Sequence, residues 1–245
     1  MPKLSLKDIF SVSTQSLHFQ ILLPFLIPTI FYIIVTSFLF QYLGEGLFIF
    51  QKGEEAVGFV YRWAVLIFLA LLIYIILLTF AYNLSSIILR DFAIIGKKYY
   101  ANSIKEAYYK IFNVIIVNLM VFVIFLTGLL FYAVHPILIL MGFFLAPFFY
   151  FVSPSIIIDN LSPFKAIKNS LILSLQYTMP SFILFLFSFL VIILIPLGGC
   201  FLVYFFISPE LLEKFIIYGI PILEMVFVTY ITILETVSYL NYRGY

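Results

Sequence analysis

The sequence predicts an all-α integral membrane protein with six transmembrane helices, arranged as three parallel repeats. Hydrophobic residues make up 65% of the 245 residues and charged residues only 10%, whereas a soluble domain carries about 25% charged residues. The apolar residues also gather in six runs of the length that crosses the hydrocarbon core, which is about 20 residues for a helix. In chain order these runs are Leu17–Leu43, Trp63–Leu89, Val114–Val134, Pro136–Ile158, Pro180–Ile207 and Phe215–Leu240.

The apolar runs predict helices and not barrel strands. Only helices and closed barrels satisfy the backbone inside lipid, and barrel strands alternate apolar and polar residues. Residues 67–78 show no such alternation. The first run is too long for the apolar part of a cleavable signal, and no small-residue cleavage site follows it, so we expect a span there. The pair His135-Pro136 separates the third run from the fourth and predicts a tight hairpin.

The lysines and arginines predict the orientation, because short cytoplasmic segments are enriched in them. Three lie in segments expected outside, namely Lys52, Arg62 and Lys214. The other ten lie in segments expected inside, namely Lys3, Lys7, Arg90, Lys97, Lys98, Lys105, Lys110, Lys165, Lys168 and Arg243. We therefore expect a multi-pass protein of the cell membrane with both termini in the cytoplasm.

Three short stretches before the first, third and fifth runs predict interfacial helices. Ser5 with Asp8 and Ser103 with Glu106 have the spacing of a capping box. In this motif the serine oxygen accepts a hydrogen bond from an early backbone amide of the helix, and the acidic side chain accepts one from the serine's own amide. Ser162 precedes a proline, which suits the first helical position. Each stretch is amphipathic, as helices that lie in the membrane interface are.

The even-numbered runs also end alike, in Ser85-Ser-Ile-Ile-Leu-Arg-Asp91, Ser153-Pro-Ser-Ile-Ile-Ile-Asp159 and the weaker copy Thr236-Val-Ser-Tyr-Leu-Asn241. The repeating unit is therefore an interfacial helix followed by a two-span hairpin. Every copy begins on the cytoplasmic side, so the repeats are parallel, unlike the inverted repeats of many transporters. We expect a single membrane domain over residues 1–245, with repeats at 5–95, 102–159 and 162–241.

Two places in the chain carry a family resemblance. One is Leu6-Lys-Asp-Ile-Phe10 followed by Leu22-Leu-Pro-Phe-Leu-Ile-Pro28, and the other is Pro154-Ser-Ile-Ile-Ile-Asp159 followed by Pro163-Phe-Lys-Ala-Ile-Lys-Asn-Ser-Leu171. Together they resemble a broad group of uncharacterised prokaryotic, often archaeal, six-span membrane proteins. That group includes the membrane domain found beside glycerophosphodiester phosphodiesterases. The resemblance implies an architecture and no reaction, since the phosphodiesterases carry their chemistry in a separate soluble domain.

The sequence contains no motif for a cofactor or a metal. It lacks phosphate-binding loops, dinucleotide fingerprints, zinc-binding helices and nucleophile elbows. Cys200 is the only cysteine, so an internal disulfide is impossible. His18 and His135 are expected on opposite faces of the membrane. We expect no catalytic residues, no metal and no cofactor.

Four polar residues inside the spans are candidates for an intramembrane site: Glu224, Glu235, Asn83 and Asn118. A carboxylate in a span is costly and is a functional candidate by default. Glu224 and Glu235 are three helical turns apart, so they share a face and could form part of a proton or cation path. The structural alternative also remains open. In it, Glu224 bonds a neighbouring helix, Glu235 pairs with a base such as Arg90, and the asparagines join helices.

Basic residues at the cytoplasmic interface are candidates for contact with lipid headgroups, since lysines near an anionic leaflet favour binding. They are Arg90, Lys97, Lys98, Lys105, Lys110, Lys165 and Lys168. Asp91 and Asp159 end their helices nearby and are expected to anchor turns.

These observations favour a non-enzymatic membrane protein that interacts with lipids or organises another membrane component. One alternative is a transporter or channel for a small solute or ion that uses Glu224. A second is a membrane-embedded lipid enzyme, for which only Arg90, Asp91, Asp159 and Glu235 could serve. The expected partners are membrane lipids and a second membrane protein. The net charge of +2 gives no reason to expect nucleic acid, and the sequence does not indicate an oligomeric state.

Overall fold

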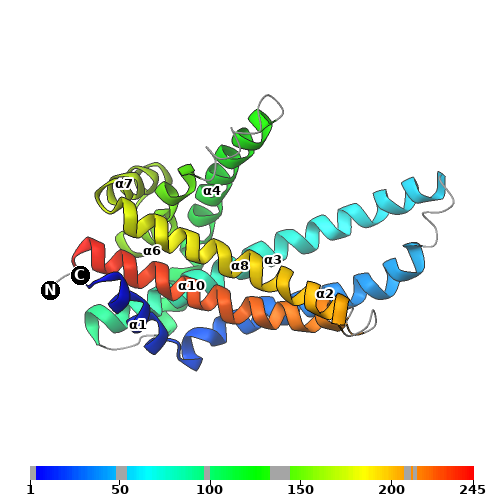
Figure 1. Ribbon diagram of the computed structural model, residues 1–245, viewed down its shortest axis with the longest axis horizontal. Coiled ribbons are helices and arrows are strands. Elements are labelled where there is room, and N and C mark those ends of the chain that lie inside the picture. The colour runs from blue at the N-terminus through cyan, green and yellow to red at the C-terminus, as the bar shows by residue number, and fades with distance from the viewer. Residues whose placement is uncertain (1–3, 48–53, 97–99, 133–143, 207–210, 212–213) are drawn as a thin grey trace.

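The computed structural model describes residues 4–47, 54–96, 100–132, 144–206, 211 and 214–245, and every regular element in this part of the chain is a helix (Figure 1). The long helices are α2, α3, α4, α8 and α10, and the short ones are α1, η2, α6, α7 and the π-helical turn η3. In chain order their bounds are α1 Leu6–Gln15, α2 Phe19–Leu47, α3 Glu54–Ile95, α4 Tyr100–Tyr132, η2 Ala146–Phe149, α6 Val152–Asp159, α7 Pro163–Gln176, α8 Thr178–Phe206, η3 Phe215–Gly219 and α10 Ile220–Arg243.

Five described helical segments are long and apolar enough to cross a membrane, which confirms the predicted all-α membrane class. They are Phe19–Leu39, Trp63–Ile95, Tyr100–Val123, Thr178–Gly199 and Phe215–Arg243. Each overlaps one of the predicted runs. The longest helix, α3, has 42 residues and at 1.5 Å per residue measures roughly 63 Å. A hydrocarbon core is about 30 Å thick, so part of α3 projects beyond it.

The predicted fourth run, Pro136–Ile158, is not a single helix where the structure describes it. Residues 136–143 lie outside the described part of the chain. The remainder is the 3-10 turn η2 followed by α6, and together they make a short apolar stretch, Ala146–Asp159. Pro147 sits at the start of η2 and Pro154 in the first turn of α6, positions where the missing N–H of proline is tolerated. A sixth span stays a prediction.

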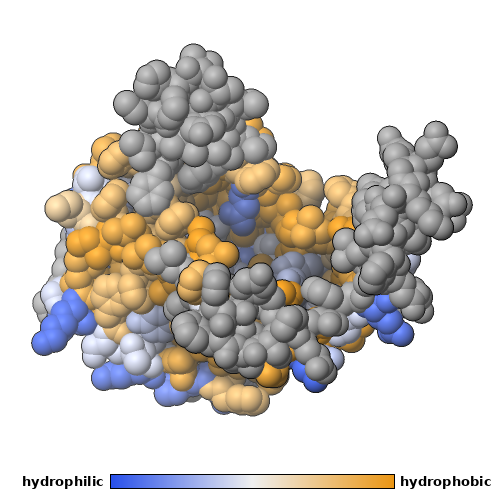
Figure 2. Space-filling model, turned by 45° about the vertical axis from the view of Figure 1, so that its right-hand side comes forward, coloured by the Kyte–Doolittle hydropathy of each residue, from blue (hydrophilic) through white to orange (hydrophobic). Residues whose placement is uncertain are grey.

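The helices diverge at one end of the molecule (Figure 1), and apolar side chains of α3 are exposed there. In α3 the residues from 65 to 76 are exposed almost all round the helix, with Phe68 at 62%. Figure 2 shows apolar residues over most of the coloured part of one face, with hydrophilic residues along its lower edge. Soluble monomers rarely expose contiguous apolar patches above a few hundred Å². Lipid is the solvent that this half of the molecule requires.

At the other end the helices converge, and both termini lie there (Figure 1). Here α3, α6 and α10 contact one another. Ile87, Ile157 and Ile233 belong to one buried cluster, and the Thr236 hydroxyl donates to the Ser86 hydroxyl at 3.1 Å. The three segments that end alike in the sequence therefore meet in the core.

The contacts fix the directions of the helices. Tyr74 of α3 contacts Glu224 of α10 and Tyr82 contacts Glu235, so α3 and α10 run parallel. The chain ends are joined, since the Leu4 amide donates to the Asn241 side-chain oxygen at 2.8 Å.

Two of the three predicted interfacial helices are separate elements. In α1, Ser5 and Asp8 form the predicted capping box. In α7, Ser162 is the N-cap and Pro163 the first residue, as predicted. The prediction that Ser103 caps a helix is wrong, because α4 begins at Tyr100 and runs without a break to Tyr132. The Ser103 hydroxyl instead donates to Asp91 at 3.2 Å.

Candidate functional site

The two carboxyl groups predicted to share a face of the last span do lie along one interface, between α3 and α10. The Tyr74 hydroxyl donates to Glu224 at 2.9 Å, and the Tyr82 hydroxyl donates to Glu235. The expected partner of Glu235, Arg90, is not its partner; a tyrosine takes that place. A phenol can stabilise a buried carboxyl group in either protonation state, since its oxygen both donates and accepts.

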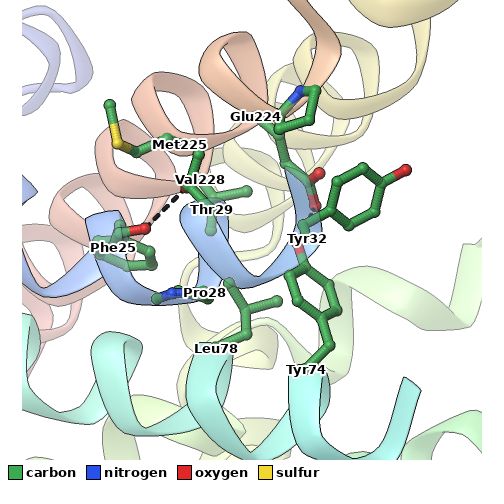
Figure 3. Close-up of a pocket in the computed structure, with 10 residues that line it drawn as sticks. Phe25, Pro28, Thr29, Tyr32, Tyr74, Leu78, Glu224, Met225 and Val228 are labelled. Carbon is green, nitrogen blue, oxygen red and sulfur yellow. Dashed lines mark hydrogen bonds between the residues drawn. The ribbon is translucent and has the colours of Figure 1, made fainter. Parts of the chain in front are cut away.

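The space beside Glu224 is narrow on the side that faces α2 and α3 (Figure 3). It measures about 10 Å³, which is room for about one water molecule. Glu224 reaches it from α10, with Tyr32 and Tyr74 beside it from α2 and α3. On its other side Glu224 borders a wider cavity of about 220 Å³ toward α8, lined otherwise by apolar side chains, among them Ile192 and Phe227.

Glu235 borders a separate cavity of about 250 Å³ between α3, α4, α6 and α10. Tyr82, Asn118 and Ser153 line it too, and the Ser153 hydroxyl donates to the Asn118 side-chain oxygen at 3.2 Å. The structure therefore brings Glu235 and Asn118, two of the four intramembrane candidates, to one cavity.

Asn83 lies apart from this cavity and joins α3 to α4. Its side chain is fully buried, and its Nδ2 donates to the Ala107 carbonyl at 3.2 Å. This contact matches the structural alternative for the asparagines, in which an amide inside a span bonds a neighbouring helix.

Arg90 and Lys110, two of the expected headgroup contacts, have protein partners. Both terminal nitrogens of Arg90 donate hydrogen bonds to the Glu106 carboxylate, at 2.7 and 2.8 Å. Arg90 also donates to Asp91 at 2.7 Å. Lys110 is buried and donates to Glu106 and to the Ile157 carbonyl, each at 2.5 Å. These bonds join α3, α4 and α6 at the converging end.

The outward face of α4 beside this ion cluster is apolar. Ile104, Tyr108 and Phe112, spaced four residues apart, are 48–71% exposed. This stretch of α4 therefore turns an apolar stripe outward while Glu106 and Lys110 point inward and Lys105 stays exposed, which differs from the pattern of a helix in a water-soluble protein. An apolar stripe of this kind suits contact with lipid.

An open groove lies over the same stretch of α4 and the turn after α6. It measures about 460 Å³. Its polar lining contains two lysines, three asparagines, one tyrosine and one glutamate, namely Asn102, Lys105, Glu106, Tyr109, Lys110, Asn113 and Asn160. Asn160 ends α6 in the left-handed conformation, with φ of 55°. The two lysines are among the predicted headgroup contacts, whereas the three asparagines that accompany them were not predicted.

The remaining basic candidates are spread over two places. Lys165 and Lys168 are exposed on α7, away from the groove lining. Lys97 and Lys98 lie outside the described residues.

Asp159 ties the C-terminus to α6, as its expected role as an anchor requires. It accepts bonds from Tyr239 and Arg243 at 2.7 Å and from Tyr245 at 2.8 Å. The pKa of the Tyr245 hydroxyl is raised because that hydroxyl donates to the Asp159 carboxylate. Small polar residues that the sequence analysis missed add to this end: the Ser170 hydroxyl donates to the Phe148 carbonyl at 2.8 Å.

Within the described residues, no group of three or more histidine, cysteine, aspartate or glutamate side chains could hold a metal ion. Comparisons with protein-family models, with curated proteins and with solved structures found no match. The resemblance to prokaryotic six-span membrane proteins stays a prediction.

Proposed function

We propose that this chain is a non-enzymatic integral membrane protein that binds anionic phospholipid at its cytoplasmic interface, alone or to organise a second membrane protein. The observation that carries the proposal is the groove over α4, which adjoins the exposed apolar stripe of Ile104, Tyr108 and Phe112 on the same helix. One surface therefore offers polar donors for a headgroup and apolar contact for acyl chains.

The chemistry of the groove suits a phosphate. Lys105 is exposed, whereas Lys110 and Glu106 neutralise each other at 2.5 Å. Lys105 therefore supplies the positive charge that lies open in this lining. The side-chain amides of Asn102, Asn113 and Asn160 add neutral donors that can bond phosphate or glycerol oxygens. A lysine close to an anionic leaflet contributes about 1 kcal/mol to binding.

Lipid retention tests the proposal. The full chain is reconstituted in vesicles of phosphatidylcholine with phosphatidylglycerol, extracted in mild detergent, and its retained lipid is measured by mass spectrometry. We expect the wild type to retain phosphatidylglycerol over phosphatidylcholine. Lys105→Gln should lower the affinity of the chain for phosphatidylglycerol about fivefold, the equivalent of about 1 kcal/mol. Lys165→Gln, which removes an equal charge from α7, is the matched control and should retain the lipid.

Two results would contradict the proposal in different ways. Equal losses in Lys105→Gln and Lys165→Gln would mean that surface charge in general, and not the groove, attracts the lipid. If the wild type shows no preference for phosphatidylglycerol, the chain does not bind anionic phospholipid selectively, and the proposal itself is wrong.

The partners of the acidic and basic groups support a non-enzymatic function. The second alternative, a lipid enzyme, needs Arg90, Asp91, Asp159 and Glu235 to act at one site. Arg90 and Asp91 pair with each other, Asp159 holds the C-terminus, and Glu235 borders a different cavity. Their contacts serve the packing of three separate helix ends.

We further propose six spans in three parallel repeats, with both termini in the cytoplasm of a cell. An odd number of crossings would separate the chain ends, whereas Leu4 and Asn241 are hydrogen-bonded to each other. Five candidate spans therefore call for one more crossing, and the predicted run Pro136–Ile158 supplies it. The mutual contacts of α3, α6 and α10 support the repeat, and the distribution of lysine and arginine supports the orientation.

A further inference from the structure

The narrow space at Glu224 and the cavity at Glu235 share two apolar lining side chains. Leu78 of α3 and Val228 of α10 line the narrow space beside Glu224 and also the cavity beside Glu235. Val228 in addition lines the wider cavity between Glu224 and α8. Leu78 and Val228, which we name the apolar plug, thus stand between two carboxyl groups on one interface.

From this arrangement we propose a proton path along the α3–α10 interface, closed at the apolar plug. Glu224 and Glu235 are its two proton-holding groups, and Tyr74 and Tyr82 bond them from α3. The carboxyl groups are eleven residues apart in one helix, which is about 16 Å along its axis. That span is too long for direct transfer, so a proton needs water at the plug to pass from the Glu224 carboxyl to the Glu235 carboxylate.

The dimensions favour a proton over a larger solute. The space that joins Glu224 to both residues of the plug admits about one water molecule, at about 10 Å³, whereas the wider cavity beside Glu224 reaches Val228 and not Leu78. A hydrated metal cation or an organic solute is larger than one water. A proton needs only a chain of exchangeable donors and acceptors, and carboxyl, phenol and water provide one.

The plug keeps this path closed in the arrangement of the structure. Leu78 and Val228 offer water no hydrogen bond, and an apolar constriction excludes water and so blocks ions. Opening it requires a displacement of α3 against α10 or a polar group in the constriction. The inference goes beyond lipid binding and uses none of the residues of the groove.

Proton flux into proteoliposomes tests the inference. The full chain is reconstituted in vesicles that contain a pH-sensitive dye, and a potassium gradient with valinomycin drives protons inward. Val228→Thr keeps the volume of the side chain but gives water a partner, so we expect at least a tenfold higher flux than in the wild type. Ile222→Thr, on the exposed side of α10, is the matched control and should stay at the wild-type rate. Leu78→Ala, a second way to open the plug, should also raise the flux.

The carboxyl groups decide the outcome. Adding Glu235→Gln to Val228→Thr should return the flux to the wild-type rate, because the proton then loses its acceptor. A flux that persists in this double variant, or an unchanged flux in both Val228→Thr and Leu78→Ala, would overturn the inference. Neither result would bear on phosphatidylglycerol retention, which is measured separately and depends on Lys105.

Discussion

Removing the charge of Glu106 should destabilise the converging end of the molecule more than any single change of an exposed charge. Glu106 accepts two bonds from Arg90 and one from Lys110, at 2.5–2.8 Å. In Glu106→Gln those two cations keep their positions but lose the carboxylate between them. Their side chains are only 18% and 7% exposed, so water compensates them poorly.

The magnitude follows from burial. Breaking a fully buried ion pair by removing one partner costs about 3–5 kcal/mol, whereas an exposed pair contributes about 0–1 kcal/mol. The Glu106 side chain is 33% exposed, and Arg90 retains Asp91 as a partner. We therefore expect Glu106→Gln to lower the free energy of unfolding by about 2–3 kcal/mol. By the relation for chains of 150–250 residues, this is a fall in Tm of about 4–12 °C.

Thermal unfolding of the purified chain in detergent, followed by tryptophan fluorescence or circular dichroism, measures this effect. Lys165→Gln is the control, because an exposed surface change stays within about 0.5 kcal/mol. A double-mutant cycle with Arg90→Gln should give an interaction energy of about 1–3 kcal/mol. A Tm of Glu106→Gln within about 1 °C of the wild type would refute the view that the cluster holds α3, α4 and α6 together.

Two further predictions concern local structure at the same end. Ser5→Ala should raise the amide exchange rate of α1 roughly fivefold, since it removes an N-cap. The pKa of Asp8 is lowered from its ordinary 3.8, chiefly because the Ser5 hydroxyl and amide donate to its carboxylate. The contribution of the Asp8 carboxylate to the stability of α1 is therefore complete above about pH 4 and is lost as the pH falls through the lowered pKa. Amides of α1 that stay as well protected from exchange at lower pH as they are above about pH 4 would contradict this. Asn160→Ala should lower stability by about 1–2 kcal/mol because φ is 55° there, whereas Asn160→Gly should not; equal melting of the two variants would contradict this.

Hydropathy predicted the spanning helices because the match to the solvent is a property of composition over about 20 residues. The predicted apolar runs overlap all five described candidate spans. The caps of α1 and α7 were also predictable, since Ser5 with Asp8 and Ser162 with Pro163 carry local signals that depend on no distant residue. Among the predicted caps, the local signal was misleading at Ser103. The Ser103 hydroxyl donates to Asp91, twelve residues earlier in the chain, and α4 already starts at Tyr100.

The partners of the charged groups could not be predicted, because they depend on how each helix is rotated against its neighbours. Glu235 meets Tyr82 and not Arg90 for this reason. One signal was available at α4. Ile104, Tyr108 and Phe112 form a stripe that lipid attracts, so Glu106 and Lys110 on the opposite side must face protein. The groove itself had no such signal, since Asn160 reaches it from the turn after α6.

The most direct test of the account is the location of the two chain ends relative to the membrane. Reporters that are active on only one side of the membrane are fused in turn to the N-terminus and to the C-terminus of the full chain. The bonds between Leu4 and Asn241 require both ends on one face, and the basic residues place that face in the cytoplasm. We expect cytoplasmic signals from both fusions; signals from opposite faces would contradict a shared location of the two chain ends.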